Sequence, residues 1–154
     1  RTSVEDEFLN NYLLSGGARA ELGGMIEMCY PATCEKHIPQ WSMWYVLELY
    51  DYFTKRGRGD RKDDFKEQLY ALLGYFKKFE NEFGLLEKLP SWVFVEWSKA
   101  NDYVQDVNYP SNMCYCGMLK AASKILGGRP ELEAKAETQP NRMPMSSAPP
   151  VPSQ

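Results

Sequence analysis

The amino-acid sequence predicts an all-α fold built from helical hairpins, and three observations predict it. Apolar residues recur at helical spacing in five separate segments of the chain. Glycine or proline, the residues that most often stop or start a helix, stands at the ends of most of these segments. Segments that are apolar on most sides alternate with segments that carry one apolar stripe. Buried and surface helices should therefore alternate, as in a ring of helical hairpins.

The first predicted helix presents one apolar face and ends at Ser15-Gly16-Gly17, a run that favours helix termination. Its apolar residues are Val4, Phe8, Leu9, Tyr12 and Leu13. A second helix is predicted from about Pro39 to Lys55. Because it is apolar almost all round, we expect it to be buried on most sides. Its apolar residues include Trp41, Met43, Trp44, Tyr45, Val46, Leu47, Leu49, Tyr50, Tyr52 and Phe53.

A third helix, from about Asp63 to Asn81, carries a single apolar stripe, so it should be an outer helix that packs on one face only. The stripe consists of Phe65, Leu69, Leu72, Leu73, Phe76 and Phe79. The fourth helix, from about Ser111 to Leu126, is apolar on most sides and is stopped by Gly127-Gly128. Pro130 then starts a short fifth helix over Glu131 to Glu137.

Residues 1–138 are predicted to form one domain, because a chain of 154 residues that is 44% hydrophobic can bury a core. Residues 139–154 contain half of the ten prolines together with several serines, which predicts a flexible or polyproline-like tail. The chain begins at Arg1 rather than at a methionine, so we expect it to be a piece of a longer protein.

Charge and hydropathy argue against two classes of partner. The 21 acidic residues outnumber the 18 basic ones and give a net charge of -3, which disfavours nucleic acid or an anionic membrane surface. No stretch reaches the roughly 18 consecutive apolar residues of a membrane span, and the N-terminus lacks a secretory pattern. We therefore expect no nucleic acid partner and no membrane partner, and the cellular compartment is not predicted.

Four cysteines and a single histidine raise the question of a metal site. The spacing Cys29-x4-Cys34-x2-His37 is compatible with zinc, but Cys114 and Cys116 lie about 200° apart around a helix and cannot both face one ion. Cys29 also stands among apolar residues. We expect reduced, buried thiols with no metal and no cofactor, and disulfide bonds are an open alternative.

The long connection from Leu85 to Pro110 and the start of the second helix hold the candidate functional residues. The alternation in residues 92–97 predicts a short strand with aromatic residues on both sides. Aromatic faces cover the C–H surface of a pyranose while carboxylates and amides bind its hydroxyl groups, so this mixture favours a sugar site. The candidate substrate-binding residues are Trp41, Trp92, Glu96, Trp97, Asp102 and Asn112.

Two readings of these residues are open. Glycoside hydrolysis uses two carboxyl groups about 6.5–9.5 Å apart for inversion or about 5–5.5 Å apart for retention, and Glu96 with Asp102 or Asp106 is a conceivable pair. Phe94 and Val95 beside Glu96 would desolvate its carboxyl group and favour the protonated form that a general acid needs. In the other reading the tryptophans belong to the core and Glu96 forms a structural ion pair.

Four segments, in order and with compatible spacing, resemble the α-L-rhamnosidase-like six-hairpin glycosidases, glycoside hydrolase family 78. They are residues 24–32 (Gly-Met-Ile-Glu-Met-Cys-Tyr-Pro-Ala), 38–44 (Ile-Pro-Gln-Trp-Ser-Met-Trp), 92–98 (Trp-Val-Phe-Val-Glu-Trp-Ser) and 107–112 (Val-Asn-Tyr-Pro-Ser-Asn). The resemblance covers residues 4 to about 138. It implies an (α/α)6 barrel whose cleft is lined by the N-termini of inner helices, and inverting attack of water on a terminal α-L-rhamnoside.

On this resemblance, Glu96 and Trp97 match an acidic-aromatic position that lines the site, while Trp41 and Asn112 lie at the starts of inner helices. The family's general acid is a glutamate in a Cys-Pro-x-Arg-x-Glu-Arg stretch, which would lie upstream of Arg1, and its general base lies on a later hairpin. Five predicted helices also fall short of the twelve in six hairpins. The resemblance therefore implies an internal fragment of the barrel, inactive alone, with Glu96 as the best catalytic candidate within the chain.

The partners implied are a rhamnoside and the rest of the glycosidase barrel. An incomplete ring leaves the apolar flanks of the helices at 41–55 and 111–126 uncovered, and exposed apolar surface drives association, so we expect the isolated chain to self-associate. The alternative function is that of a non-catalytic helical module that binds carbohydrate or a protein partner.

Overall fold

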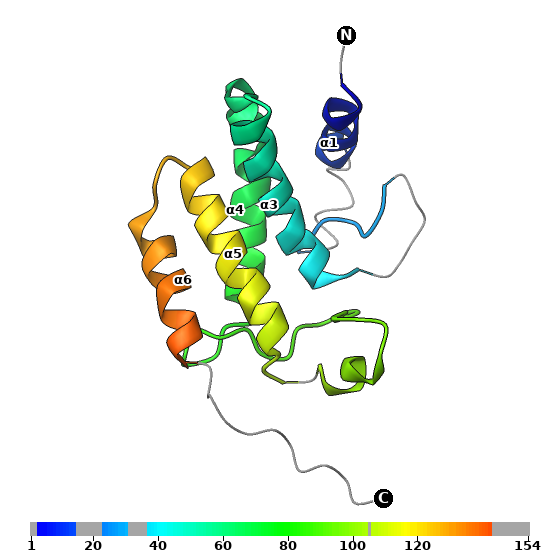
Figure 1. The fold of residues 1–154 in the computed structure, drawn as a ribbon, viewed down its shortest axis with the longest axis vertical. Helices are drawn as coiled ribbons and strands as arrows, with labels where there is room; N and C mark the ends of the chain where they lie inside the picture. The colour runs from blue at the N-terminus through cyan, green and yellow to red at the C-terminus, as the bar shows by residue number, and fades with distance from the viewer. Residues whose placement is uncertain (1–2, 15–22, 31–36, 105, 143–154) are drawn as a thin grey trace, which may run out of the picture.

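The computed structural model confirms the all-α fold (Figure 1). It describes residues 3–14, 23–30, 37–104 and 106–142. This part of the chain contains five α-helices and no β-strand. The helices are α1 (Val4–Leu14), α3 (Pro39–Lys55), α4 (Lys62–Lys77), α5 (Tyr109–Ile125) and α6 (Pro130–Arg142), with two short 3₁₀ helices, η1 (Gly59–Arg61) and η2 (Lys99–Tyr103).

The helices form two hairpins that lie side by side. α3 and α5 pack against each other and run in the same direction, and each is followed by a helix that returns in the opposite direction (Figure 1). α4 lies behind α3 and α5, and α6 packs against the far side of α5 (Figure 1). α3 and α5 thus occupy the central positions that their wide apolar faces predict, while α4 and α6 are outer helices.

The hydrophobic core lies between α3, α4 and α5. Aromatic rings join the three helices: the Phe53 and Phe65 ring centroids are 5.7 Å apart, and those of Phe76 and Tyr115 are 5.8 Å apart. A hydrogen bond of 2.8 Å from the Tyr45 hydroxyl to Gln68 Oε1 satisfies one of the few polar groups in this core. Phe65, Leu69, Leu72 and Phe76 of the predicted α4 stripe are buried, whereas Leu73 and Phe79 are half-buried. α4 ends at Lys77, four residues before the predicted end, so Phe79 lies beyond it.

The ends of the helices follow local chemistry. α3 begins at the predicted residue because Pro39 supplies a pre-set φ angle at its first position, and it also ends at the predicted Lys55. α5 begins two residues before the prediction, since Asn108 caps it by accepting a hydrogen bond of 2.9 Å from the Ser111 N–H. α5 ends at Ile125, one residue before the prediction, and the predicted stop at Gly127-Gly128 has φ of +83° and +85°.

α6 continues to Arg142, past the predicted end at Glu137. The buried Gln139 side chain anchors this last turn, because its Nε2 donates to the Gly84 carbonyl over 2.8 Å and its Oε1 lies 3.0 Å from Cys116 Sγ. The predicted domain boundary after residue 138 therefore falls inside α6. Residues 143–154 of the predicted tail lie outside the described residues, so that part stays a prediction.

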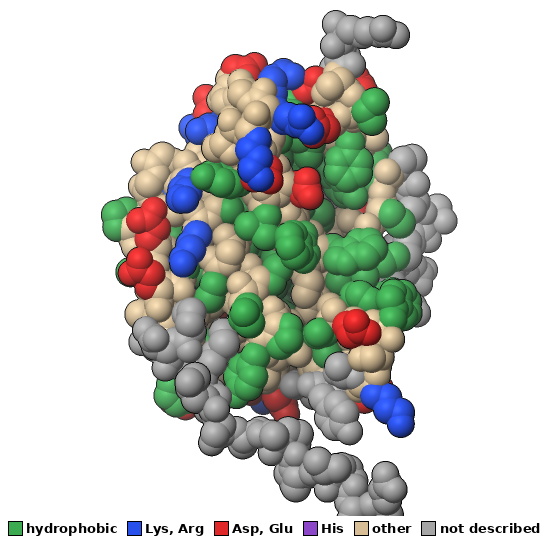
Figure 2. Space-filling view, viewed as in Figure 1, with side chains coloured by type: hydrophobic (Ala, Val, Ile, Leu, Met, Phe, Trp, Pro, Cys, Tyr) green, Lys and Arg blue, Asp and Glu red, His purple; other side chains and the backbone are tan. Residues whose placement is uncertain are grey.

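One face of α3 and α5 is uncovered. Trp41, Trp44 and Met113 expose 42%, 58% and 67% of their surface, so the expectation that α3 is buried on most sides is wrong for this flank. Figure 2 shows hydrophobic side chains gathered on this face, over the central helices. The uncovered apolar flank predicted for both helices is therefore present.

The predicted strand at residues 92–97 is absent, and the segment is irregular backbone. Alternating residues form a strand only when another strand pairs with their backbone, and here other groups do so. The Trp92 N–H donates to the His37 carbonyl over 3.0 Å, and the Val95 and Glu96 N–H groups donate to Asn101 Oδ1 over 2.8 and 3.2 Å. Hydrogen bonds to a backbone carbonyl and to a side-chain amide thus replace the hydrogen-bond ladder of a sheet.

Gln40 joins this loop to both central helices. Its Nε2 donates to Ser111 Oγ at the start of α5 over 2.7 Å, and its Oε1 accepts from the Phe94 N–H over 3.3 Å. The Ser111 hydroxyl in turn donates to Asn108 Oδ1. One buried amide therefore fixes the loop against the N-terminal ends of α3 and α5.

In the described part of the chain, no helix has the length and hydropathy needed to cross a membrane.

Candidate functional site

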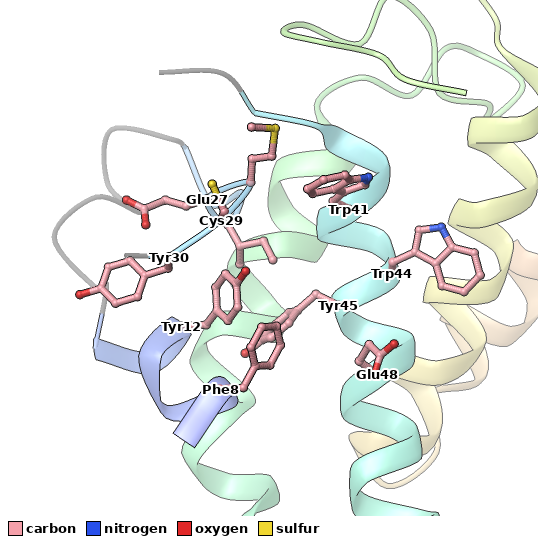
Figure 3. Close-up of a pocket in the computed structure, with 11 residues that line it drawn as sticks. Phe8, Tyr12, Glu27, Cys29, Tyr30, Trp41, Trp44, Tyr45 and Glu48 are labelled. Carbon is pink, nitrogen blue, oxygen red and sulfur yellow. The ribbon is translucent and has the colours of Figure 1, made fainter. Parts of the chain in front are cut away.

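A cleft of about 450 Å³ lies between α1, residues 26–30 and α3, and carboxylate, phenol and thiol groups converge on it (Figure 3). We call it the aromatic cleft, because six of its eleven lining residues are aromatic. The lining residues are Phe8, Tyr12, Ile26, Glu27, Met28, Cys29, Tyr30, Trp41, Trp44, Tyr45 and Glu48. They include two carboxylates and no basic residue.

The two helices supply opposite walls of the cleft. Figure 3 shows Trp41 and Tyr45 extending from α3, and Phe8 and Tyr12 extending from α1, into the space between them. Trp44 points away from this space, towards α5. Trp41 and Tyr45 are four residues apart and so share one face of α3.

The third wall, residues 26–30, is held in place by one glycine and one hydrogen bond. Gly24 has φ of +117°, and a Cβ atom built on it would lie 2.5 Å from the Ala71 carbonyl oxygen of α4. Only glycine allows the backbone to approach α4 so closely. The Ile26 N–H then donates to Ser42 Oγ of α3 over 3.2 Å. The position of this wall therefore depends on contacts with both α3 and α4.

α1 is fixed by a buried carboxylate. Asp6 Oδ1 accepts hydrogen bonds from the Tyr52 hydroxyl and, over 2.6 Å, from Arg58 Nη1. These contacts, with the Tyr52 bond foremost, hold the pKa of Asp6 well below its usual range. Asp6 and Ser3 also form a reciprocal capping box, since each backbone N–H donates to the other side chain over 3.0–3.1 Å.

The aromatic cleft is mostly apolar, and its polar side chains include the Tyr12 hydroxyl and the Glu27 carboxylate. Burial raises the pKa of Tyr12, and the nearby Cys29 and Glu27 raise it further, so the Tyr12 hydroxyl keeps its proton at neutral pH. Glu27 Oε2 is buried without a hydrogen-bond partner among the described residues. An unsatisfied carboxylate oxygen is costly and is often completed by a ligand or water.

A second concavity, which we call the apolar hollow, lies on the other side of Trp44, between α3, α5 and the loop. Its volume is about 450 Å³. It is lined by Gln40, Trp44, Leu47, Phe94, Val95, Pro110, Met113, Cys114 and Gly117. Because both groups of the Gln40 amide are already hydrogen-bonded, the hollow offers little to a polar ligand.

A third concavity, the loop cavity, lies within the connection between α4 and α5. Its volume is about 310 Å³. It is lined by Lys88, Leu89, Ser91, Trp92, Val93, Asn101, Val104 and Asp106. In contrast to the other two, polar groups make up much of its wall.

The predicted substrate-binding residues are not brought together in one site. Trp41 lines the aromatic cleft and Trp92 lines the loop cavity. Trp97 is 81% exposed and packs its ring on Phe94, with centroids 4.9 Å apart. Asp102 is exposed on η2 and lines none of the three concavities.

Asn112 has a structural role instead of a place on a sugar-binding wall. It is fully buried, its Oδ1 accepts from the Leu86 N–H over 2.7 Å, and its Nδ2 donates to the carbonyls of Leu86 and Asn108 over 3.0 Å. A wholly buried amide with both groups engaged cannot reach a ligand. It fastens the loop at residue 86 to the first turn of α5.

Glu96 does not have the environment expected of a general acid. Its side chain is exposed, whereas the sequence predicted that Phe94 and Val95 would desolvate it. Phe94 packs its ring against Trp97 instead, and both Phe94 and Val95 line the apolar hollow. The candidate partners Asp102 and Asp106 are exposed as well.

The cysteines within the described residues are free thiols. Cys29 is exposed, in contrast to the predicted buried thiol, while Cys116 is buried and burial raises the pKa of Cys114 to about 11. No group of three or more His, Cys, Asp and Glu side chains that could hold a metal ion occurs in the described part of the chain. Cys34 of the zinc alternative lies outside it.

Several cleft residues were missed by sequence reasoning. Glu27 and Tyr30 lie within the segment 24–32 that carries the resemblance, which is the one signal that could have pointed to them. Tyr12 and Glu48 looked like ordinary helix-face residues, and only the packing of α1 against α3 brings them to one cleft.

No known family model, curated protein or solved structure matches this chain.

Proposed function

We propose that this chain binds carbohydrate in the aromatic cleft and forms part of the sugar-binding wall of an α-L-rhamnosidase-like six-hairpin glycosidase, which hydrolyses terminal α-L-rhamnosides with inversion. The observation that carries the proposal is the exposed indole of Trp41 in the first turn of α3, over a cleft that also holds Glu27 and Glu48. An aromatic face with carboxylates beside it is the combination that sugar sites use.

The arrangement of the hairpins supports the wider proposal of an incomplete (α/α)6 barrel. α3 and α5 are parallel neighbours, and their returning helices α4 and α6 lie outside them (Figure 1). Their N-terminal ends meet the same loop through Gln40. The uncovered flank that carries Trp44 and Met113 is the surface that further hairpins of such a ring would cover.

Binding is tested by titrating the full chain with L-rhamnose and following tryptophan fluorescence. We expect saturable quenching in the millimolar range that is lost in Trp41→Ala, because the stacking face of the cleft is removed. Tyr70→Ala is the matched control, since Tyr70 is an exposed aromatic residue on the outer helix α4. This variant should bind as the parent chain does.

Two results would contradict the cleft as the sugar site. One is the absence of any response at high millimolar rhamnose. The other is binding that survives Trp41→Ala but is lost in Trp97→Ala, which would move the site to the exposed loop.

Catalysis is proposed to need the rest of the barrel, because the resemblance puts the general acid and general base outside residues 1–154. We expect the isolated chain to leave an aryl α-L-rhamnoside intact. Hydrolysis that Glu96→Gln abolishes would instead make Glu96 catalytic.

A helical module that binds a protein partner is the second candidate, and the apolar hollow favours it. The exposed Trp44 and Met113 flank a hollow whose polar groups are already engaged, so a partner there must be apolar. In the proposed glycosidase this partner is another hairpin of the same barrel. Failure of every sugar to bind, together with association through Trp44, would favour this candidate.

A further inference from the structure

The loop cavity contains an unusual concentration of left-handed backbone. Among the described residues, three that are not glycine have φ in this region: Lys88 at +52°, Ser91 at +71° and Asp106 at +57°. All three line the loop cavity. Such conformations are strained and tend to cluster at ligand sites, where the surrounding structure enforces them.

Defined contacts enforce these conformations. The Lys88 N–H donates to the Asp106 carbonyl over 3.0 Å, which joins the two sides of the cavity. The Ser91 hydroxyl donates to the His37 carbonyl over 2.9 Å and accepts from the His37 N–H over 3.3 Å. Glycine would relieve the strain at each position, yet none of the three is glycine. The side chains at these positions are therefore the feature that needs an explanation.

The cavity wall presents one aromatic residue, one amide and one carboxylate. Asn101 Oδ1 is engaged by the Val95 and Glu96 N–H groups, so its Nδ2 supplies the hydrogen-bond donors of this side chain. Asp106 is an exposed acceptor. Trp92 is half-buried and adds an aromatic surface. Donor, acceptor and aromatic surface together suit a polyhydroxylated ring.

The charge of the cavity argues for a neutral ligand. Lys88 Nζ is 2.8 Å from Glu87 Oε1, so its charge is balanced within the chain. Glu87, Lys88 and Asp106 together carry a net charge of -1, which disfavours a carboxylated sugar. The volume of about 310 Å³ lies at the lower end of the 300–1,000 Å³ range of ligand pockets. It has room for a single pyranose unit.

We propose that the loop cavity is a second saccharide subsite, in which Trp92, Asn101 and Asp106 bind one neutral pyranose unit. The proposal deepens the proposed function and rests on it. The cavity adjoins the start of α3, because the Trp92 N–H and the Ser91 hydroxyl donate hydrogen bonds to the carbonyl of His37, two residues before the helix. Trp41 of the aromatic cleft lies in the first turn of the same helix. The ligand recognised is then an oligosaccharide with units on both sides of one helix end.

Site-resolved NMR of the full chain separates the two subsites. The indole N–H resonance of Trp92 reports on the loop cavity, and that of Trp41 reports on the aromatic cleft. We expect titration with L-rhamnose to shift the Trp92 indole and the Asn101 side-chain amide saturably. The same concentration of D-glucuronate should leave both resonances in place.

Three variants test the chemistry. Asp106→Asn keeps a residue that tolerates left-handed φ but removes the charge, and should weaken the Trp92 response at least tenfold. Asp106→Gly should raise the melting temperature, because strain is relieved, and should also abolish the response. Glu82→Gln, which removes an exposed carboxylate outside the cavity, is the matched control and should bind as the parent chain does.

The outcomes distinguish this subsite from the cleft. Shifts at Trp41 without shifts at Trp92 would overturn the second subsite and leave the proposed function intact. Shifts at Trp92 that persist in Asp106→Asn, or that D-glucuronate causes equally, would overturn the assigned recognition chemistry. Loss of the Trp41 response alone would count against the cleft and not against the loop cavity.

Discussion

Gly24 allows the sharpest test of how the aromatic cleft is built. In Gly24→Ala, the new Cβ atom would lie 2.5 Å from the Ala71 carbonyl oxygen and 3.0 Å from its carbonyl carbon, at a φ of +117°. The backbone strain alone costs about 1–3 kcal/mol. Because backbone atoms of α4 cannot rotate away, overpacking adds about 1–3 kcal/mol. We expect the free energy of unfolding to fall by about 2–6 kcal/mol.

Gly57→Ala is the matched control, because Gly57 also has positive φ, +69°, but a Cβ atom there meets nothing within 4 Å. The left-handed conformation costs about 1–2 kcal/mol, and the loss of unfolded-state entropy offsets about 0.4–1 kcal/mol of it. The net loss should therefore be about 1 kcal/mol. Urea denaturation followed by circular dichroism measures both variants.

The same pair of variants tests the link between packing and binding. Gly24→Ala should also weaken rhamnose binding, since the wall at residues 26–30 is displaced from α3 and α4, whereas Gly57→Ala should leave binding unchanged. Equal losses of stability in the two variants would refute the steric reasoning. A destabilised Gly24→Ala with unchanged binding would refute the claim that this wall shapes the cleft.

Three further predictions concern stability and association. The lowered pKa of Asp6 contributes stability that is present above the unfolded-state pKa of about 4 and is lost as the pH falls below it. Asp6→Asn should therefore lower the melting temperature at pH 7 and make the melting temperature decline less steeply in acid. Asn112→Ala leaves the Leu86 N–H and carbonyl without partners, so the free energy of unfolding measured in urea should fall by about 2–4 kcal/mol. Met113→Ala, the control, removes an exposed neighbouring side chain and should change this free energy by less than about 1 kcal/mol. Sedimentation velocity should show concentration-dependent association that Trp44→Glu removes, and a monodisperse parent chain at high concentration would contradict it.

The helices could be predicted because their signals are local. Pro39 and the Gly127-Gly128 pair mark helix ends through backbone geometry alone, and both were located correctly. α5 was predicted two residues late because the capping role of Asn108 depends on its rotamer, which the spacing of apolar residues does not reveal. The length of α6 depends on burial of Gln139 against Gly84, a contact between residues far apart in sequence.

The site was predicted less completely, because long-range contacts assemble it. Alternation at residues 92–97 suggested a strand, but a strand also needs a partner, and amide side chains took that place. Trp41 was chosen for its position at a helix start and does line the cleft. Glu27 becomes a neighbour of Trp41 through the close approach of Gly24 to α4, and Tyr12 does so through the packing of α1 against α3; periodicity encodes neither contact.

The Gln40 amide makes three parts of the molecule mechanically dependent on one another. The loop cannot swing away from α3 without giving up the Phe94 bond, and α3 and α5 cannot slide apart at this end without giving up the Ser111 bond. Opening of the hairpin interface and release of the loop are thus coupled motions. Exchange of the Phe94 amide proton with solvent should therefore report how often the two hairpins separate at the end that carries the candidate sites.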